Sequence, residues 1–405
     1  MSSPMHTTQN DDQDWLQVDA GDIDAFIAET SVSTELSEWP LANAVEQNVL
    51  VYNGDHVRQA ALNSNDKAKL MREWALALST GPGIVAIKNA MPEHDVIDSA
   101  NELFDKIINQ QRESGGGQGD HFAKPGANDR VWNSLEKHCV LDPASFARYY
   151  MNDTIAMIST AWLGRGYQVT AQVNRVNPGG NAQSAHRDYH LGFMSGEQAV
   201  LFPQHVHLFC PMLTLQGAVA HCDMPLESGP TLYLPYSQLH KQGYIAFTRE
   251  DYQQYFNEHR MQLALNKGDM VFFNPALMHA AGANQSSNIY RLANLLQVSS
   301  AFGRSIETVD RTGMVQALYP QLLALKSSGS ITDGQLHNLI AATAEGYAFP
   351  TNLDIDLPSD GLAPPSQADL VLQCLHDALP SAEFTNLLIE QAQRKTSVAS
   401  AHKPV

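Results

Sequence analysis

The sequence predicts a mainly β core wrapped by helices, an α+β fold in which the β part forms a sandwich or barrel. Between residues 167 and 300, short apolar, β-branched or aromatic runs alternate with turn residues, which is the pattern of such a core. On both sides of this region apolar residues recur at helical spacing. We find no internal repeat, so we expect one elaborated β domain with helical additions.

The N-terminal part predicts a tail, a strand and two helices. Residues 1–12 are polar and acidic, which is typical of a disordered tail. "EQNVLVY" reads as a strand that ends in the Asn-Gly-Asp turn at 53–55. "NDKAKLMREWALALS" has Leu70, Trp74 and Leu78 on one face behind a cap at Asn65 or Asp66, so it is an amphipathic helix.

The next segments predict a buried strand, a helix and a long loop. "IVAIKN" reads as the strand and "PEHDVIDSANELFDKIINQQ" as the helix, with a proline near its start. "SGGGQGDHFAKPGANDR" is rich in glycine and long for a loop, and loops of this length inside compact domains are often functional or disordered.

The β region and the segments that follow it complete the prediction. The expected strands are "YQVTAQVNRV", "QHVHLFCPMLTL", "GAVAHCDM", "TLYLPYS", "MVFFNPA" and "RLANLLQVS". After residue 305, Asp333 can cap a helix over "GQLHNLIAATAEGY", and Ser366 with Asp369 forms a capping box ahead of another. We expect residues 13–304 to form the β domain with its N-terminal helices, and residues 305–405 a helical extension packed on it.

Composition and charge exclude several classes of function. The formal charge is −18, which argues against binding to nucleic acid or to an anionic membrane, because both need basic stripes. No apolar run is long enough to span a bilayer, and the N-terminus lacks the basic and apolar regions of a secretory signal. The four cysteines lie far apart with no CxxC pair, so we expect a cytoplasmic, reducing setting. A homodimer is compatible with the sequence but not indicated by it.

The stretch "NAQSAHRDYHLGF" concentrates polar groups beside the turn "VNPGG". In a strand, His186 and Asp188 would point to the same side and Arg187 to the other. Two ligands at this spacing cannot close a metal site, so a third must come from another strand. The best candidate is His279, which follows a strand-like run and is itself followed by small residues that leave room for a co-substrate.

Two neutral imidazoles and one carboxylate form the facial triad of non-haem Fe(II) oxygenases, which leaves coordination positions open. Arg291 follows His279 by twelve residues in an otherwise apolar strand. Burying a guanidinium there has a large desolvation cost unless a carboxylate forms paired hydrogen bonds with its planar N–H groups. A dicarboxylate co-substrate would be such a partner.

This order of residues resembles a known family. A His-x-Asp pair, a histidine about ninety residues later and an arginine a dozen residues on are similar to the 2-oxoglutarate-dependent Fe(II) dioxygenases. More narrowly, the chain resembles the phytanoyl-CoA dioxygenase family over roughly residues 83–300. The supporting segments are "GIVAIKNAMPEHDVID", "NPGGNAQSAHRD", "ESGPTLYLPYSQLH" and "KGDMVFFNPALMHAAGAN".

The resemblance implies a double-stranded β-helix, or jelly-roll, core. It implies Fe(II) held by His186, Asp188 and His279, and Arg291 gripping the distal carboxylate of 2-oxoglutarate. The implied reaction uses O₂ to decarboxylate 2-oxoglutarate to succinate and to hydroxylate a C–H bond of a small-molecule substrate. On the strand that leads to the "NPGG" turn, Gln172 and Asn174 are candidate contacts for 2-oxoglutarate or the substrate.

Two other hypotheses stay open. His205 and His207 form a His-x-His pair, and with His221 they suggest a cupin-like metalloenzyme that needs no 2-oxoglutarate, although the glutamate that usually follows such a pair is missing. The third hypothesis is a non-catalytic jelly-roll binding protein. Further candidates for the pocket are His190, as a neighbour of the ligands, Tyr233, Arg130 and Lys124, while Cys210 and Cys222 read as small inert hydrophobic residues.

Overall fold

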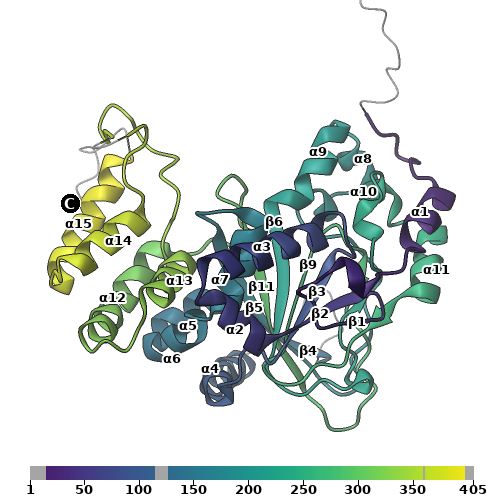
Figure 1. Ribbon diagram of the computed structural model, residues 1–405, viewed down its shortest axis with the longest axis horizontal. Helices are drawn as coiled ribbons and strands as arrows, with labels where there is room; N and C mark the ends of the chain where they lie inside the picture. Colours follow the sequence, from purple (N-terminus) through teal and green to yellow (C-terminus); the bar gives the residue numbers. More distant parts are fainter. Residues whose placement is uncertain (1–14, 115–125, 359–360, 397–405) are drawn as a thin grey trace, which may run out of the picture.

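The computed structural model describes residues 15–114, 126–358 and 361–396. Figure 1 shows a central group of strands, a layer of helices along one side of it, and the C-terminal helices at one end of the molecule. The expected tail at residues 1–12 lies outside the described residues. Within the described part of the chain, no helix is both long and apolar enough to cross a membrane.

The large sheet has eight strands in the order β1-β2-β3-β9-β6-β11-β5-β4. Every neighbouring pair is antiparallel except β2 with β3, which is parallel. The strands are β1 (Ala44–Glu46), β2 (Val49–Asn53), β3 (Ile84–Lys88), β4 (Asn128–Val131), β5 (Gln168–Val176), β6 (Thr214–Ala220), β9 (Met270–Phe273) and β11 (Arg291–Ser299).

A second, smaller sheet lies against the interior face of the first. Its order is β10-β7-β8, with β7 (Leu232–Tyr233), β8 (Met261–Gln262) and β10 (His279–Ala280). Single-residue bridges extend it, joining His186 to His279 and Met224 to Leu265. The two sheets form the predicted jelly-roll. Between them lies an apolar cluster that includes Tyr233 and Phe273, whose rings meet edge to face.

The large sheet separates two environments. Leu215, Leu292 and Val298 point into the main hydrophobic core, which the sheet shares with the helices. The intervening residues of β6 and β11 line a cavity on the opposite face. This alternation follows from the period of two in a strand, and it lets one sheet provide both the core and a pocket wall.

Helices from the N-terminal half cover the outer face of the large sheet. They are α2 (Gly54–Ala61), α3 (Ser64–Ser79), α4 (His94–Glu113), α5 (Ser134–Leu141), α6 (Pro143–Tyr150) and α7 (Asp153–Leu163), while α1 (Ile23–Thr30) lies apart from them (Figure 1). The predicted helices at α3 and α4 are confirmed. The sequence reading did not identify α5, α6 and α7.

Three predictions at the start of this region need correction. The strand predicted at 46–52 is confirmed from Val49 onward as β2, but Gln47 and Asn48 have positive φ and form the turn of the hairpin between β1 and β2. Asn53 does not begin a turn. Its side chain accepts a hydrogen bond from the Asp55 amide and caps α2. In the same way, the cap of α3 is Asn63 instead of Asn65 or Asp66.

Short helices connect the strands of the jelly-roll. They are η1 (Leu36–Glu38), η2 (His190–Phe193), α8 (Gly196–Ala199), α9 (Gln204–Phe209), η3 (Cys210–Leu213), η4 (Leu226–Ser228), η5 (Ser237–Leu239), α10 (Gly243–Ala246) and α11 (Glu250–His259). The predicted strand at 204–215 is therefore wrong over most of its length: residues 204–213 are helical, and β6 begins at Thr214.

Four helices follow β11: α12 (Arg311–Ser327), α13 (Asp333–Thr343), α14 (Gln367–His376) and α15 (Ser381–Arg394). The predicted capping box of Ser366 and Asp369 is confirmed. The cap of α13 is Thr332, which forms a capping box with Gln335, instead of the expected Asp333. Leu318, Leu339 and Phe384 belong to the same core cluster as the helix-facing side of the large sheet, so these helices pack on the outer layer.

Candidate active site

The backbone brings His186 and His279 together. Each donates its N–H to the carbonyl of the other, at N–O distances of 2.9 and 3.0 Å. The amide of Asp188 donates to the carbonyl of Pro275 at 2.9 Å. The strand expected at 186–188 is thus a single β-bridge followed by an irregular segment, and it still places both side chains on one side.

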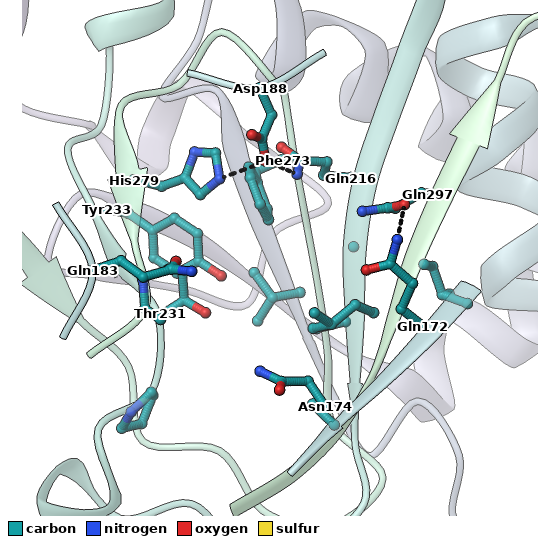
Figure 2. Close-up of a pocket in the computed structure, with 18 of the residues that line it drawn as sticks. Gln172, Asn174, Gln183, Asp188, Gln216, Thr231, Tyr233, Phe273, His279 and Gln297 are labelled. Carbon is teal, nitrogen blue, oxygen red and sulfur yellow. Dashed lines mark hydrogen bonds and ion pairs between the residues drawn. The ribbon is translucent and has the colours of Figure 1, made fainter. Parts of the chain in front are cut away.

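His186, Asp188 and His279 form a compact group of possible metal ligands. One ligand atom from each lies within 4.8 Å of the others, and within the described residues this is the one group of three or more such side chains. His279 Nε2 is 3.3 Å from one carboxylate oxygen of Asp188, and His186 Nε2 is 3.7 Å from the other (Figure 2 labels Asp188 and His279).

Backbone carbonyls fix the protonation of both imidazoles. His186 Nδ1 lies 2.9 Å from the carbonyl of Ser184, and His279 Nδ1 lies 2.7 Å from that of Leu277. Because a carbonyl can only accept, each Nδ1 carries the proton. Each Nε2 therefore presents its lone pair toward the cluster, as a metal ligand requires.

The electrostatics favour a neutral His186 and an ionised Asp188. Burial, followed by the charge of His279, lowers the pKa of His186. Burial would raise the pKa of Asp188, but its contacts with His279 and His186 and the hydrogen bond from the Gln216 amide favour the carboxylate and lower the pKa to about 2. Two neutral imidazoles with a carboxylate are the protonation states that a divalent cation needs.

Arg187 points away from the cluster, as predicted. Its guanidinium is buried and donates to the carbonyls of Ser237 and His240, and it lies over the Tyr244 ring at 5.6 Å. A Cβ placed at Gly243 would be 1.8 Å from its Cζ. Arg187 thus fastens the ligand-bearing segment to the neighbouring chain between η5 and α10.

The cluster opens into a cavity of about 610 Å³ between the two sheets. The walls come from β5, β6, β9 and β11 on one side and from β7 and the segment before His186 on the other (Figure 2). Arg291, Gln172, Asn174, Tyr233 and Arg130, all singled out from the sequence, line it.

Arg291 is a buried cation at the cavity wall. Its guanidinium Nη1 has two weak contacts, at 3.4 Å to the Ser228 carbonyl and 3.3 Å to the Gly282 carbonyl. Within the described residues no carboxylate pairs with it. Burial lowers its pKa to about 10. A planar cation left in this state at a cavity wall is suited to a carboxylate ligand.

The two predicted amides, Gln172 and Asn174, differ in how much of their hydrogen-bonding capacity is already used. Gln172 accepts from Arg130 at 2.9 Å and donates to Gln297 at 3.1 Å, so its carboxamide is engaged on both sides. Asn174 has a buried oxygen to which no described residue donates a hydrogen bond. Of the pair, Asn174 is the one with capacity for a ligand.

Gln216 belongs to the site although the sequence reading did not single it out. Its Nε2 donates to the Asp188 carboxylate from the middle of β6. The sequence does show a glutamine in the apolar run "TLQGAVA". It could be recognised as a site residue only if one knew which face of this strand lines the cavity.

His190 is not on the same strand face as Asp188. Tyr189 and His190 both have positive φ, and His190 begins η2, so the chain turns away after the ligand. Lys124 lies outside the described residues.

The histidines of the cupin-like hypothesis are not brought together. His205 and His207 lie on α9 instead of a strand. His207 Nε2 contacts the Ala199 carbonyl, and His221 is buried between Tyr149 and Asn101, at 2.8 and 2.6 Å. Within the described residues they form no ligand group, so the structure offers no metal site for this alternative hypothesis.

Comparison with known proteins decides the family. The sequence profile of the family described as phytanoyl-CoA dioxygenase (PhyH) matches residues 80–293, which is more than half of the chain. The chain belongs to the phytanoyl-CoA dioxygenase family. As a member of this family it is an oxygenase of the iron- and 2-oxoglutarate-dependent type, and the cluster of His186, Asp188 and His279 is suited to hold the metal.

Three solved structures illustrate the low similarity of this family member to proteins of known structure. The α-ketoglutarate-dependent epimerase SnoN from nogalamycin biosynthesis is 18% identical, over 58% of this chain and 82% of that one, with a TM-score of 0.41. The carbocyclase SnoK from the same biosynthesis is 19% identical, over 56% and 83%, at 0.41. HygX from Streptomyces hygroscopicus, with nickel and 2-oxoglutarate bound, is 14% identical, over 59% and 91%, at 0.38. No curated protein matches the chain.

Proposed function

We propose that this oxygenase hydroxylates a C–H bond of a small molecule, with conversion of 2-oxoglutarate and O₂ to succinate and CO₂. The observation that carries the proposal is the combination of two features in one cavity. These are the ligand cluster of His186, Asp188 and His279, and the unpaired guanidinium of Arg291.

The ligand cluster fits Fe(II). Two imidazole nitrogens and one carboxylate on one side of a metal leave the remaining positions for a chelating acid and O₂. His186 and His279 would bind iron through Nε2, because Nδ1 of each is held by a carbonyl. Asp188 would supply the carboxylate ligand, and the Gln216 amide, which donates to it, would orient it.

Arg291 binds the distal carboxylate of 2-oxoglutarate in this proposal. The carboxylate would replace two long contacts to carbonyls with charge-assisted hydrogen bonds. Asn174 lies on the same wall, and its carboxamide has capacity for a second hydrogen bond to the co-substrate. Gln172 would act on the bound molecule only indirectly, through its hydrogen bond to Gln297.

When bound, iron and 2-oxoglutarate supply the oxidation: one atom of O₂ enters succinate and the other becomes the hydroxyl of the product, with release of CO₂. The chain's own residues do the positioning. Arg291 fixes the far end of the co-substrate, the ligand cluster fixes the near end, and the two sheets screen the reacting atoms from bulk water.

The test needs no substrate. Fe(II) and then 2-oxoglutarate are added to the metal-free protein under anaerobic conditions, and the visible charge-transfer band of the chelate is followed. We expect a band in the wild type and an apparent affinity for 2-oxoglutarate about 100-fold weaker in Arg291→Ala, the equivalent of ~3 kcal/mol for a charge-assisted pair. Absence of a band at saturating iron would refute the proposal.

A further inference from the structure

Two glutamines face each other beside the ligand cluster. Gln216 on β6 and Gln297 on β11 are Cα partners in adjacent antiparallel strands, and both line the cavity. Side chains on directly opposite residues of such a pair lie close together on the same face. Together they form a polar patch next to Asp188, whereas Ala218 and Leu295 make the adjoining part of the same wall apolar.

The orientation of Gln216 is fixed by Asp188. The Gln216 amide nitrogen donates to the Asp188 carboxylate, and a carboxylate that serves as a metal ligand presents only acceptor oxygens. The amide oxygen of Gln216 is therefore the free end. That oxygen is buried and has no hydrogen-bond partner, and the residue is 7% exposed.

The orientation of Gln297 is fixed from the other side of the cavity. The Arg130 guanidinium can only donate, so the atom of Gln172 that meets it is the amide oxygen. Gln172 then donates through its nitrogen to the amide oxygen of Gln297. Gln297 is left with its nitrogen, which Figure 2 shows pointing into the cavity and which has no partner within the described residues.

The two chains of hydrogen bonds therefore leave an acceptor and a donor on residues that are Cα partners in adjacent strands. One starts at Asp188, which only accepts, and leaves a carbonyl oxygen on Gln216. The other starts at Arg130, which only donates, and leaves an N–H group on Gln297. A buried polar atom without a partner costs about 1–3 kcal/mol, so the Gln216 oxygen favours a ligand that donates to it, and the Gln297 nitrogen, which is not fully buried, can donate to the same ligand.

We propose that Gln216 and Gln297 together recognise a neutral group of the substrate that both donates and accepts hydrogen bonds, a hydroxyl or a primary amide. The inference rests on the proposed function and names the substrate class for that site. A carboxylate would face the Gln216 oxygen and an ammonium would face the Gln297 N–H, so either ion is disfavoured here. A hydrocarbon leaves both ends unsatisfied.

The position of the pair beside Asp188 sets which bonds react. A substrate held there presents the carbons next to its hydroxyl or amide to the metal. The rest of the substrate meets the apolar side chains that line the cavity farther out, Trp132, Phe193 and Ile306. An aromatic ring with one polar substituent therefore represents the proposed class.

The experiment uses the full chain loaded with Mn(II) and saturating 2-oxoglutarate, with Zn(II) as the diamagnetic reference. The probes are benzyl alcohol, benzamide, toluene and benzoate, and the readout is the paramagnetic broadening of their proton signals by Mn(II). We expect benzyl alcohol and benzamide to bind at least about 10-fold more tightly than toluene or benzoate, the equivalent of one hydrogen bond.

Three variants identify the residues responsible. Gln216→Leu and Gln297→Leu should each reduce the preference to within about 2-fold, whereas the exposed Gln254→Leu, whose side chain bonds only to Glu258, should keep it. Gln297 touches no proposed metal ligand, so its variant separates recognition of the probe from any change in metal binding.

The outcomes are distinct. Equal broadening by toluene, a full preference retained in Gln297→Leu, or no broadening by any probe while Mn(II) and 2-oxoglutarate are bound would each overturn the inference alone. Failure of the wild type to bind Mn(II) and 2-oxoglutarate would refute the proposed function, and with it the inference.

Discussion

His186 and His279 are joined by two reciprocal backbone hydrogen bonds, and their ring centroids lie 4.5 Å apart. The spacing of the two rings is therefore set by main-chain pairing and not by side-chain packing alone. Residues far apart in the sequence meet at one bridge, and the proposed metal site inherits the rigidity of that bridge.

We expect His279→Ala to weaken Co(II) binding by at least about 100-fold, since loss of a direct ligand should exceed the 10–100-fold effect known for residues that only support one. The measurement is a titration of metal-free protein with Co(II), followed by its visible absorption. His205→Ala is the matched control, because His205 lies on α9 outside the cluster. Unchanged binding in His279→Ala would contradict the assignment.

Arg291→Met should separate stability from binding. It replaces a buried cation that has only two weak contacts, so the metal-free variant should melt at or above the wild-type temperature. Adding 2-oxoglutarate at 100 times its Kd to the Mn(II)-loaded wild type should stabilise it by about 2.7 kcal/mol, and the variant by much less at the same concentration. Thermal unfolding with and without 2-oxoglutarate measures both effects. A variant that melts lower and still responds fully would contradict this role.

Tyr149→Phe should lower the free energy of unfolding by about 1–3 kcal/mol, because it removes the hydroxyl that pairs with His221 and accepts from Asn294 in a fully buried setting. Metal affinity should stay at the wild-type value, since this network lies on the helix side of the sheet. Urea unfolding and the Co(II) titration test the two halves. A loss of metal with normal stability would return His221 to the list of ligands.

The stability of the protein should depend on Glu307 between pH 4.5 and 7. Burial, opposed by the hydrogen bond from the Asn133 amide, raises the pKa of Glu307 from 4.5 to about 7. The folded state then holds a proton that the unfolded state releases. Its contribution is fully present below pH 4.5 and is lost as the pH rises through 7, about 3 kcal/mol in total. When the free energy of unfolding in urea is measured across this pH range, it should fall less steeply for Glu307→Gln than for the wild type. Parallel pH dependence of the two proteins would contradict this role of Glu307.

Gly243→Ala should weaken metal binding without touching a ligand. The added Cβ would fall on the Arg187 guanidinium and displace the residue that lies between His186 and Asp188. We expect a loss of about 10-fold or more, as for other residues that support ligands. In the double variant Gly243→Ala/Arg187→Ala, the two effects should be far from additive, because they act through one contact. Additive effects would show that the contact does not position the site.

The sequence was sufficient to predict those residues whose charged or metal-binding side chains are energetically costly to bury in a hydrophobic core without a functional partner. His186, Asp188, His279 and Arg291 stood out because charged or metal-binding groups occupied apolar strands and turns, and the structure places all four around one cavity. Their separation along the sequence did not matter, because each residue could be recognised from its own local sequence context.

Residues that depend on register could not be predicted in this way. Gln216 and Gln297 are ordinary strand residues until the pairing of β6 with β11 places them opposite each other. The run "QHVHLF" fits a strand by alternation, yet it forms α9, since six residues with polar groups at every second or third position fit either period. Helix α7 was missed because it is buried on nearly all sides, which blurs the amphipathic pattern, and α5 because two of its four buried residues, Ser134 and His138, are polar.

The place of β11 in the sheet has a consequence for synthesis. Among the described residues it is the last strand, but it lies in the interior of the sheet, paired with β5 on one side and β6 on the other. A nascent chain that has not yet released β11 from the ribosome exposes two unpaired edges, and such edges promote aggregation. It also lacks Arg291 and one wall of the cavity. Ligands that bind to that wall therefore cannot stabilise a chain from which β11 is still missing.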